Sequence, residues 1–378
     1  MKVEHPLRPP ASRHPVAWRG FLRASGLMCA LGGALIAACA ACAQQTSAPE
    51  ARPFELRVTR ARKIYSDGRH NAFTGMARLG DRTFLTFRSA ATHMTMDGKI
   101  RIIASKDLEK WQSVHLAERA NTDFRDPKLA TFGGQLLCYF AAWRERNPAS
   151  PQGGAVSMVV RSSDGRTFEE PRAVRGVRPR AWLWHVAARG DMLYAAAYGG
   201  GAKAATLYRS ADGIQWEALT DFPTPCNEVY LDFAPDGILW ALARDGLTLC
   251  RAEPPYTKLV ILNRMSMPQG GPMVKRLPTG CVIITRQWDP PGRRNLRSEV
   301  FWLPDGGKLQ SVTRLPSGGD TSYAAWLDLA PGRAIVSYYS SHEHKMDVPI
   351  GHQAKDPAEA EHTTAADIFL ADVSYAPY

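Results

Sequence analysis

Ser210-Ala211-Asp212-Gly213-Ile214-Gln215-Trp216 has the composition of a tight hairpin turn, and the chain repeats its pattern. Ser, any residue, Asp, a turn and then an aromatic residue also occur in order at residues 105–111 (SKDLEKW) and 162–168 (SSDGRTF). An Asp in this position accepts hydrogen bonds from backbone N–H groups ahead of it, and the aromatic side chain returns to the core. The first serines of the three segments lie 57 and 48 residues apart. This spacing is typical of one blade of a β-propeller.

Short apolar or alternating runs, separated by turn-forming dipeptides, fill the chain from Phe54 to Tyr375. The clearest of these predicted strands are residues 83–88, 100–105, 135–141, 155–161, 192–198, 238–243, 281–286 and 333–339. We expect no amphipathic helix, and we expect a surface loop or a single helical turn at 356–361. Short strands at this spacing are typical of sandwiches and propellers. Together with the repeated turn, at about 50 residues per blade, they predict an all-β fold, a six-bladed β-propeller over residues 54–378.

Residues 1–43 have the character of an export signal. A basic, Pro-containing start leads into an apolar run over residues 26–43, which is short for a membrane-spanning helix. Ile36-Ala37-Ala38-Cys39 has the form of a lipobox, which would place a lipid anchor on Cys39, and Ala41-Cys42-Ala43 has the form of a cleavage site. Residues 44–53 form a polar linker. We therefore expect an exported protein, either in the periplasm or secreted after cleavage, or as an outer-membrane lipoprotein.

The composition limits the classes of partner that the protein is expected to bind. A formal net charge of +11 favours anionic partners. The basic residues are scattered and not clustered, so nucleic acid is not expected as a partner. The cysteines follow no zinc-binding motif, and no metal or cofactor is expected. Cys138 and Cys281 lie in apolar strand patterns, whereas Cys226 and Cys250 could form a disulfide between neighbouring strands.

Five residues in the second half of the chain occur in a characteristic order. Glu228 and Arg244 flank a predicted hairpin, Arg286 ends a predicted strand, Tyr323 follows a Gly-Asp-Thr-Ser run, and Glu343 follows Tyr-Tyr-Ser-Ser-His. These segments resemble the sialidase superfamily of six-bladed propellers, and the repeated turn resembles their Asp box. The resemblance implies that Tyr323 is the nucleophile and Glu228 its proton acceptor. It also implies that Arg244 and Arg286 bind the substrate and that Glu343 supports a pocket arginine.

The chemistry of this pattern suits an acidic sugar. A planar guanidinium binds a carboxylate through two parallel hydrogen bonds. Tyrosine is a weak nucleophile at its ordinary pKa, and a neighbouring carboxylate such as Glu228 activates it by accepting its proton. Sialidases are the tyrosine exception among glycosidases. From the residues alone, an ordinary cross-strand ion pair between Glu228 and Arg244 and a core position for Tyr323 are open alternatives.

The first half of the chain differs from the sialidase pattern. The Arg-Ile-Pro-like triplet that would supply the first pocket arginine is absent, and Arg69 is the arginine nearest to that place. Arg88 is expected to bind the sugar. The loop that follows Arg88 lacks an obvious acid/base Asp and offers His93 or Asp97. We prefer His93, because Asp97-Gly98 has the composition of a hairpin turn.

Arg125-Asp126-Pro127 resembles a motif of five-bladed furanosidases in which the Asp holds substrate hydroxyls. Pro127 predicts an extended Asp126. Arg125 and Asp126 either contact the substrate, with Asp126 as a second candidate for the acid, or brace a neighbouring side chain. Histidines at predicted strand ends and loops could converge to move protons near neutral pH; they are His70, His93, His185 and His342.

Three functions fit these observations. The first is a secreted or lipid-anchored, retaining, sialidase-like exo-glycosidase that removes terminal acidic or decorated sugars from a glycan, which we expect to be anionic. The second is a polysaccharide lyase acting on uronic-acid polymers, because elimination needs a cation beside the carboxylate and a His or Tyr to move protons. The third is a non-catalytic glycan-binding propeller. The sequence leaves the sugar, its linkage and the oligomeric state open.

Overall fold

The structure is a computed structural model, and it describes residues 54–144, 154–244, 246–266, 270–288, 296–344 and 365–376. The described residues form 24 β-strands and contain no helix. They belong to one compact unit, Pro53–Tyr378. Within the described part of the chain, no helix is available to cross a membrane. The predicted signal, Cys39, the linker and the segment 356–361 lie outside the described residues.

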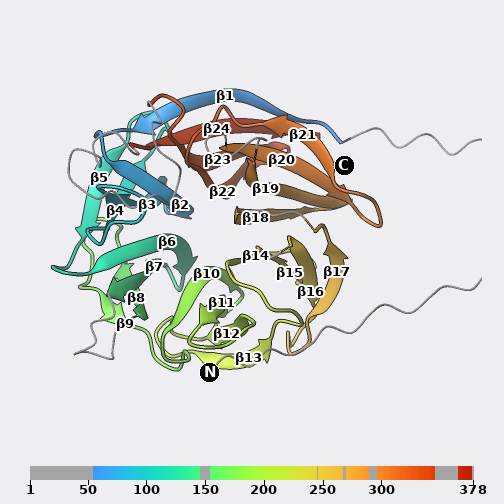
Figure 1. Cartoon of the computed structure of the whole chain (residues 1–378), viewed down its shortest axis with the longest axis horizontal. Coiled ribbons are helices and arrows are strands. Elements are labelled where there is room, and N and C mark those ends of the chain that lie inside the picture. The colour runs from blue at the N-terminus through green and yellow to red at the C-terminus, as the bar shows by residue number, and fades with distance from the viewer. Residues whose placement is uncertain are drawn as a thin grey trace, which may run out of the picture. The chain divides into compact units, whose positions relative to one another are not determined.

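The strands form six four-stranded antiparallel sheets arranged as the blades of a propeller (Figure 1). Blades one to three, from innermost to outermost strand, are β2 (His70–Leu79), β3 (Arg82–Ala90), β4 (Lys99–Ser105) and β5 (Gln112–Ala117); β6 (Asp123–Phe132), β7 (Gln135–Arg144), β8 (Gly154–Ser162) and β9 (Arg172–Ala173); and β10 (Ala181–Arg189), β11 (Met192–Gly199), β12 (Thr206–Ser210) and β13 (Glu217–Asp221). Blades four to six are β14 (Val229–Phe233), β15 (Leu239–Ala243), β16 (Thr248–Ala252) and β17 (Val260–Arg264); β18 (Gly270–Leu277), β19 (Gly280–Trp288), β20 (Leu296–Pro304) and β21 (Gln310–Arg314); and β22 (Thr321–Ala330), β23 (Arg333–Ser340), β24 (Asp367–Tyr375) and β1 (Leu56–Tyr65). The predicted all-β, six-bladed fold is confirmed, and so are the eight predicted strands, apart from small differences at their ends.

The innermost strands of neighbouring blades contact one another around the whole ring. The ring closes in blade six, where β1, from the beginning of the propeller, pairs with β24 from its end. Figure 1 shows the blue β1 beside the red β24. Both ends of the propeller therefore belong to one sheet.

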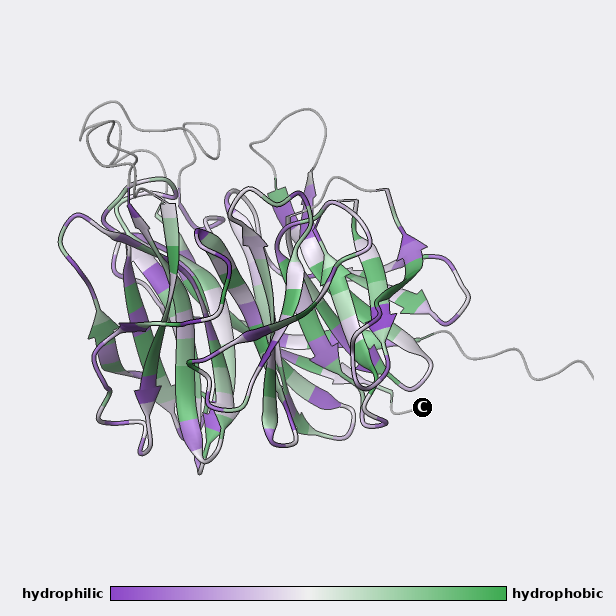
Figure 2. Ribbon diagram, turned by 90° about the horizontal axis from the view of Figure 1, so that it is seen from below, coloured by the Kyte–Doolittle hydropathy of each residue, from purple (hydrophilic) through white to green (hydrophobic). Residues whose placement is uncertain are grey.

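Buried side chains fill the spaces between the blades. The second strands are apolar along most of their length, as in β15, where every residue is buried, whereas the outermost strands are largely polar, as in β13. Figure 2 shows that hydrophobic residues occupy much of the strand interiors and that hydrophilic residues are frequent at strand ends. Cys138 and Cys281 are buried in the core, as predicted. Cys226 and Cys250 lie as buried thiols in one apolar cluster, so the predicted disulfide between them is wrong.

The three repeated turns join the third and fourth strands of blades one, two and three. In the third of them, Asp212 accepts backbone hydrogen bonds from Ile214 and Gln215, both at 2.8 Å, and Ser210 accepts one from Gly213 at 2.9 Å. Two equivalent backbone bonds lower the pKa of Asp107 and of Asp164 to about 2. We call the end of the blades where the innermost strands begin the upper face. The three repeated turns lie at the opposite end of the blades.

Near the upper face, several innermost strands contain a β-bulge. The pairing register shifts in β2, β6, β18 and β22, and Phe73, Asp126, Gly271 and Tyr323 in these bulges have positive φ angles. Asp126 has a φ of 46°, so the extended conformation predicted from Pro127 is wrong. The bulge overrides the local preference and turns the side chains at these positions.

Candidate active site

Tyr323, Glu228 and Arg244 form a hydrogen-bonded group at the upper face. Tyr323 comes from the bulge of β22, Glu228 immediately precedes β14, and Arg244 follows β15. The Tyr323 hydroxyl lies 3.1 Å from each Glu228 carboxylate oxygen, and Arg244 Nη1 donates to Oε1 of Glu228 at 2.5 Å. Tyr323 and Glu228 are 95 positions apart in the chain and are brought into contact because each lies at the upper end of an innermost strand.

Burial sets the protonation of this group. The pKa of the Tyr323 phenol is well above 10 because the side chain is buried and because Glu228 and Asp126 lie close to it. Burial also raises the pKa of the Glu228 carboxyl, although Arg244 opposes that change. A carboxylate with a raised pKa is a stronger base. The phenol of Tyr323 therefore faces a strengthened base in direct contact.

Asp320 organises a second group that the sequence analysis missed. Its Oδ2 contacts His93 Nδ1 at 2.5 Å and His70 Nε2 at 2.9 Å. Its Oδ1 accepts a hydrogen bond from the Tyr339 hydroxyl at 2.8 Å and lies 3.5 Å from Arg286 Nη1. Asp320 directly precedes β22, so one short segment supplies both this carboxylate and Tyr323.

These partners stabilise the negative charge of Asp320. Burial alone would raise its pKa, but His93 and His70 bring the pKa well below the ordinary value. Burial lowers the pKa of His70 to about 4, against the effect of Asp320. One atom each of His70, His93 and Asp320 lie within 4.8 Å of one another, a set that could hold a metal ion. The Arg286 guanidinium beside Asp320 opposes a second cation there, so the network fits a hydrogen-bonded role better.

Asp126 and Lys128 lie near Tyr323. Asp126 Oδ2 accepts a hydrogen bond from Trp184 Nε1 at 3.1 Å. Lys128 is buried, with its ammonium 5.0 Å from the Trp184 ring centroid and 5.9 Å from that of Tyr323. Burial lowers the pKa of Lys128 to about 8, while Asp126 and Glu228 act in the opposite direction. Lys128 was not among the predicted site residues, because its place in a strand after Pro127 gave no sign of the bulge.

Arg88 takes a structural role and not the sugar-binding role that we expected. It is fully buried, and it donates to Asp123 Oδ1 at 2.8 Å and to the carbonyls of Thr92 and Thr95 at 3.0 and 2.6 Å. These bonds shape the loop that carries His93. Arg125 also pairs with Asp123, and its Nη2 donates to the backbone carbonyl of His93 at 3.1 Å.

The four predicted histidines do not form one cluster. His70 and His93 share Asp320, whereas His185 packs on Tyr230 with ring centroids 3.8 Å apart and accepts the Leu231 N–H. His342 packs against Phe369, in blade six.

Glu343 binds Lys63 at 2.7 Å and not a pocket arginine, which corrects its predicted role. The carboxylate that does lie beside Arg286 is Asp320. Asp97, the alternative to His93 in the loop after Arg88, is paired with Arg69 at 2.6 Å.

Comparisons with known proteins agree on the architecture. No protein-family model matches the chain, and no curated protein matches its sequence. Among solved structures, a mutant of Trypanosoma rangeli sialidase displaying trans-sialidase activity superposes with a TM-score of 0.57 at 9% identity, over 84% of this chain and 58% of that one. The Hadza microbial sialidase Hz136 superposes with a TM-score of 0.55 at 13% identity, over 82% of this chain and 66% of that one.

Trypanosoma rangeli sialidase in complex with the inhibitor DANA gives a TM-score of 0.57 at 11% identity and covers 80% of this chain. This chain matches 55% of the length of that sialidase. At these identities the similarity establishes the fold. The protein is a six-bladed propeller of the sialidase type.

Proposed function

We propose that the protein is a sialidase-like, retaining exo-glycosidase that removes a terminal acidic sugar from a glycan. The observation that carries this proposal is the contact of the buried Tyr323 hydroxyl with both oxygens of Glu228, beside Arg244. A phenol on a basic carboxylate is the arrangement that a tyrosine nucleophile requires. The glycoside-hydrolase neighbours of the fold support the class of reaction.

Each group has a role in the proposed reaction. Arg244 and Arg286 bind the anionic group of the sugar. Glu228 accepts the phenolic proton as the Tyr323 oxygen forms a bond to the anomeric carbon, and the bond from that carbon to the leaving oxygen breaks. His93 protonates the leaving oxygen through Nε2, because Asp320 occupies its Nδ1; Asp126 is the second candidate for this acid. Water then attacks the anomeric carbon of the glycosyl-tyrosine and gives its proton to the same acid/base. The bond from that carbon to the Tyr323 oxygen breaks, and Glu228 returns its proton to that oxygen, which restores the phenol.

Turnover with covalent trapping tests the proposal. The mature protein is incubated with a panel of acidic glycans and with fluorinated glycosyl fluorides, which slow the release of a glycosyl-enzyme. We expect a mass increase of one sugar residue on the peptide that contains Tyr323, absent in Tyr323→Phe. We also expect Glu228→Gln to lower kcat by about 10²- to 10⁴-fold. Hydrolysis that persists unchanged in Tyr323→Phe would overturn the proposal.

The product of the same incubation separates the two alternative functions. A lyase is favoured by the His93–Asp320 contact and by the arginines near Tyr323. It would release an unsaturated sugar that absorbs in the near ultraviolet, whereas a hydrolase yields only a new reducing end. A non-catalytic glycan-binding propeller would release neither product from any glycan, and Tyr323→Phe would bind ligand as the wild type does.

We also propose that the protein is exported and acts on glycans outside the cytoplasm. The basic start and apolar run of residues 1–43 support export, and the Ile-Ala-Ala-Cys segment supports lipidation of Cys39. Metabolic labelling with a radioactive fatty acid tests the anchor. We expect label in the wild type and none in Cys39→Ser; equal labelling of the two would contradict the anchor.

A further inference from the structure

A cavity of about 640 Å³ opens over blades two and three. Its lining consists mostly of aromatic, basic and glycine residues at or next to the upper ends of β7, β8, β10 and β11, and includes Trp143, Arg144, Trp182 and Tyr198. The proposed reaction gives none of these residues a role. The cavity is large enough for a sugar unit.

Three aromatic rings form a row along this cavity. Trp143 and Trp182 have ring centroids 6.3 Å apart, and Trp182 and Tyr198 stack at 5.8 Å with an angle of 20° between their planes. Trp143 is 38% exposed, which is unusual for the largest apolar side chain. At the other end of the row, Tyr198 packs against the buried cluster that contains Trp182, Trp184 and Tyr323, so Tyr198 borders the reaction centre. The row therefore leads from solvent to Tyr323.

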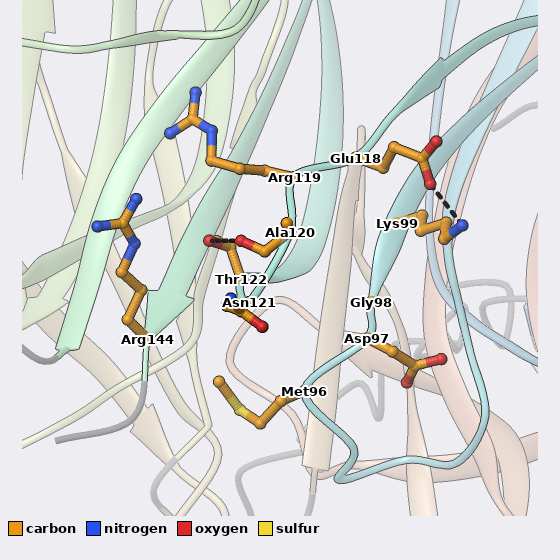
Figure 3. Close-up of a pocket in the computed structure, with 10 residues that line it drawn as sticks. All are labelled: Met96, Asp97, Gly98, Lys99, Glu118, Arg119, Ala120, Asn121, Thr122 and Arg144. Atoms are coloured by element: carbon orange, nitrogen blue, oxygen red, sulfur yellow. Dashed lines mark hydrogen bonds and ion pairs between the residues drawn. The ribbon is translucent and has the colours of Figure 1, made fainter. Parts of the chain in front are cut away.

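A second cavity, of about 960 Å³, lies beside the first and shares Arg144 with it. Figure 3 shows the side chains of Arg119 and Arg144 on one side of this cavity and the ion pair of Lys99 with Glu118 on the other. Asp97 is paired with Arg69. Among the described residues, the acids of the lining thus have basic partners, and Arg119 and Arg144 add positive charge. We call the two cavities together the blade groove.

We propose that the blade groove binds further sugar units of an anionic glycan chain, on the leaving-group side of the residue held at Tyr323. The placement of these sugar units on the leaving-group side rests on the proposed function. Sugar rings present an apolar C–H face that packs on indole and phenol rings, and exposed aromatic surface marks a binding site. The guanidiniums of Arg119 and Arg144 suit carboxylate or sulfate groups on successive units.

Binding of size-graded oligosaccharides tests the groove in a Glu228→Gln background, where turnover is slow. The probes are disaccharides and hexasaccharides of polygalacturonate and of chondroitin sulfate, with maltohexaose as the neutral comparison, and the readout is calorimetric affinity at two salt concentrations. We expect an acidic hexasaccharide to bind more tightly than its disaccharide. We expect Trp143→Ala to weaken hexasaccharide binding about tenfold, with recovery in Trp143→Phe.

Arg144→Gln should weaken the binding of the acidic hexasaccharide and reduce its salt dependence, but should leave maltohexaose unaffected. Arg57→Gln makes the same change of charge at an exposed position of β1 and should behave as the parent. The groove assignment is overturned if Trp143→Ala and Arg144→Gln both bind like the parent, or if no probe gains affinity with length. Turnover of a short glycoside is scored separately in Trp143→Ala with Glu228 intact. If the wild type shows no turnover but its affinity still rises with glycan length, the proposed hydrolase activity is wrong and the groove assignment is retained.

Discussion

Tyr323 reaches Glu228 because its backbone adopts a conformation that residues other than glycine usually avoid. Its φ is 52°, and Ser322 before it has a φ of 150°. The Thr74 hydroxyl donates to the Tyr323 carbonyl at 2.8 Å, and the Ser322 hydroxyl donates to the carbonyl of Gly270 at 3.0 Å. Strained positions of this kind persist only where the surroundings hold them. The position of Tyr323 thus depends on neighbours outside its contact with Glu228.

Gly271 is the neighbour with the least room. A Cβ on Gly271 would collide with the Ser322 hydroxyl and lie 2.8 Å from the Tyr323 ring and 2.9 Å from its amide nitrogen, at a φ of +60°. We expect Gly271→Ala to displace Tyr323 and to lower kcat by about 10²-fold, the cost of a misplacement of about 1 Å. Gly80→Ala is the matched control, because Gly80 has a φ of +59° and open space around it. Steady-state kinetics of the two variants decides; equal kcat values would show that Gly271 does not position Tyr323.

The charge of Lys128 is expected to determine how activity changes with pH on the alkaline side. Below its pKa of about 8 the ammonium is charged and, 5.9 Å from the Tyr323 ring, favours the developing phenolate. As the pH rises through 8 the charge is lost, and with it this stabilisation. We expect kcat/KM of the wild type to fall above about pH 8, and Lys128→Met to be slower at pH 7 with no decline near pH 8. Rates of both proteins across neutral and alkaline pH test this, and an unchanged decline in the variant would contradict it.

At the scale of elements, the sequence predicted what is local and periodic. Alternation and turn composition predicted the strands, and the resemblance to the sialidase superfamily predicted that Glu228, Arg244 and Tyr323 would meet. Lys128 was missed, because the bulge of β6 turns side chains to a face that alternation does not indicate. Asp320 precedes β22 and was missed because its partners, among them His70 and His93, come from distant segments of the chain. Arg88 was misassigned for a related reason: the backbone carbonyls that it binds exist only once the loop after β3 has folded.

The repeated turns also pack against the preceding blade, and Gly213 shows how closely. Its φ is +75°, and an added Cβ would lie 2.6 Å from the Tyr139 hydroxyl and 2.7 Å from Leu137 Cδ2. We expect Gly213→Ala to lower the free energy of unfolding by about 2 to 4 kcal/mol, from backbone strain and overpacking together. Gly190→Ala, at a φ of +59° with no atom within 4 Å of its Cβ, should cost about 1 kcal/mol. Urea unfolding measures both, and equal losses would show that the contact with blade two contributes little.

At the scale of the whole molecule, one strand holds the ring closed. β1 pairs with β24 along its length, and its Arg62 also reaches blade one. Arg62 binds Asp372 at 2.8 Å and donates to the carbonyl of Leu108, in the first repeated turn, at 3.0 Å. The first strand of the propeller therefore ties its last blade to its first, and the site depends on that closure because Tyr323 and Asp320 belong to blade six.

A chain that begins at Ser66 would lack β1, and a chain that begins at Phe54 would keep it. We expect the shorter chain to expose the edge of β24, to aggregate, and to unfold at a temperature at least about 10 °C lower, because an unpaired edge strand recruits other chains. A synthetic peptide of residues 54–65 should bind the shorter chain and raise its Tm, since the open edge is the natural partner of β1. Light scattering and thermal unfolding of both chains, with and without the peptide, measure the effect. If the two chains have equal Tm values and both remain monodisperse, the other three strands of blade six close the ring by themselves, and β1 is not the strand that holds it.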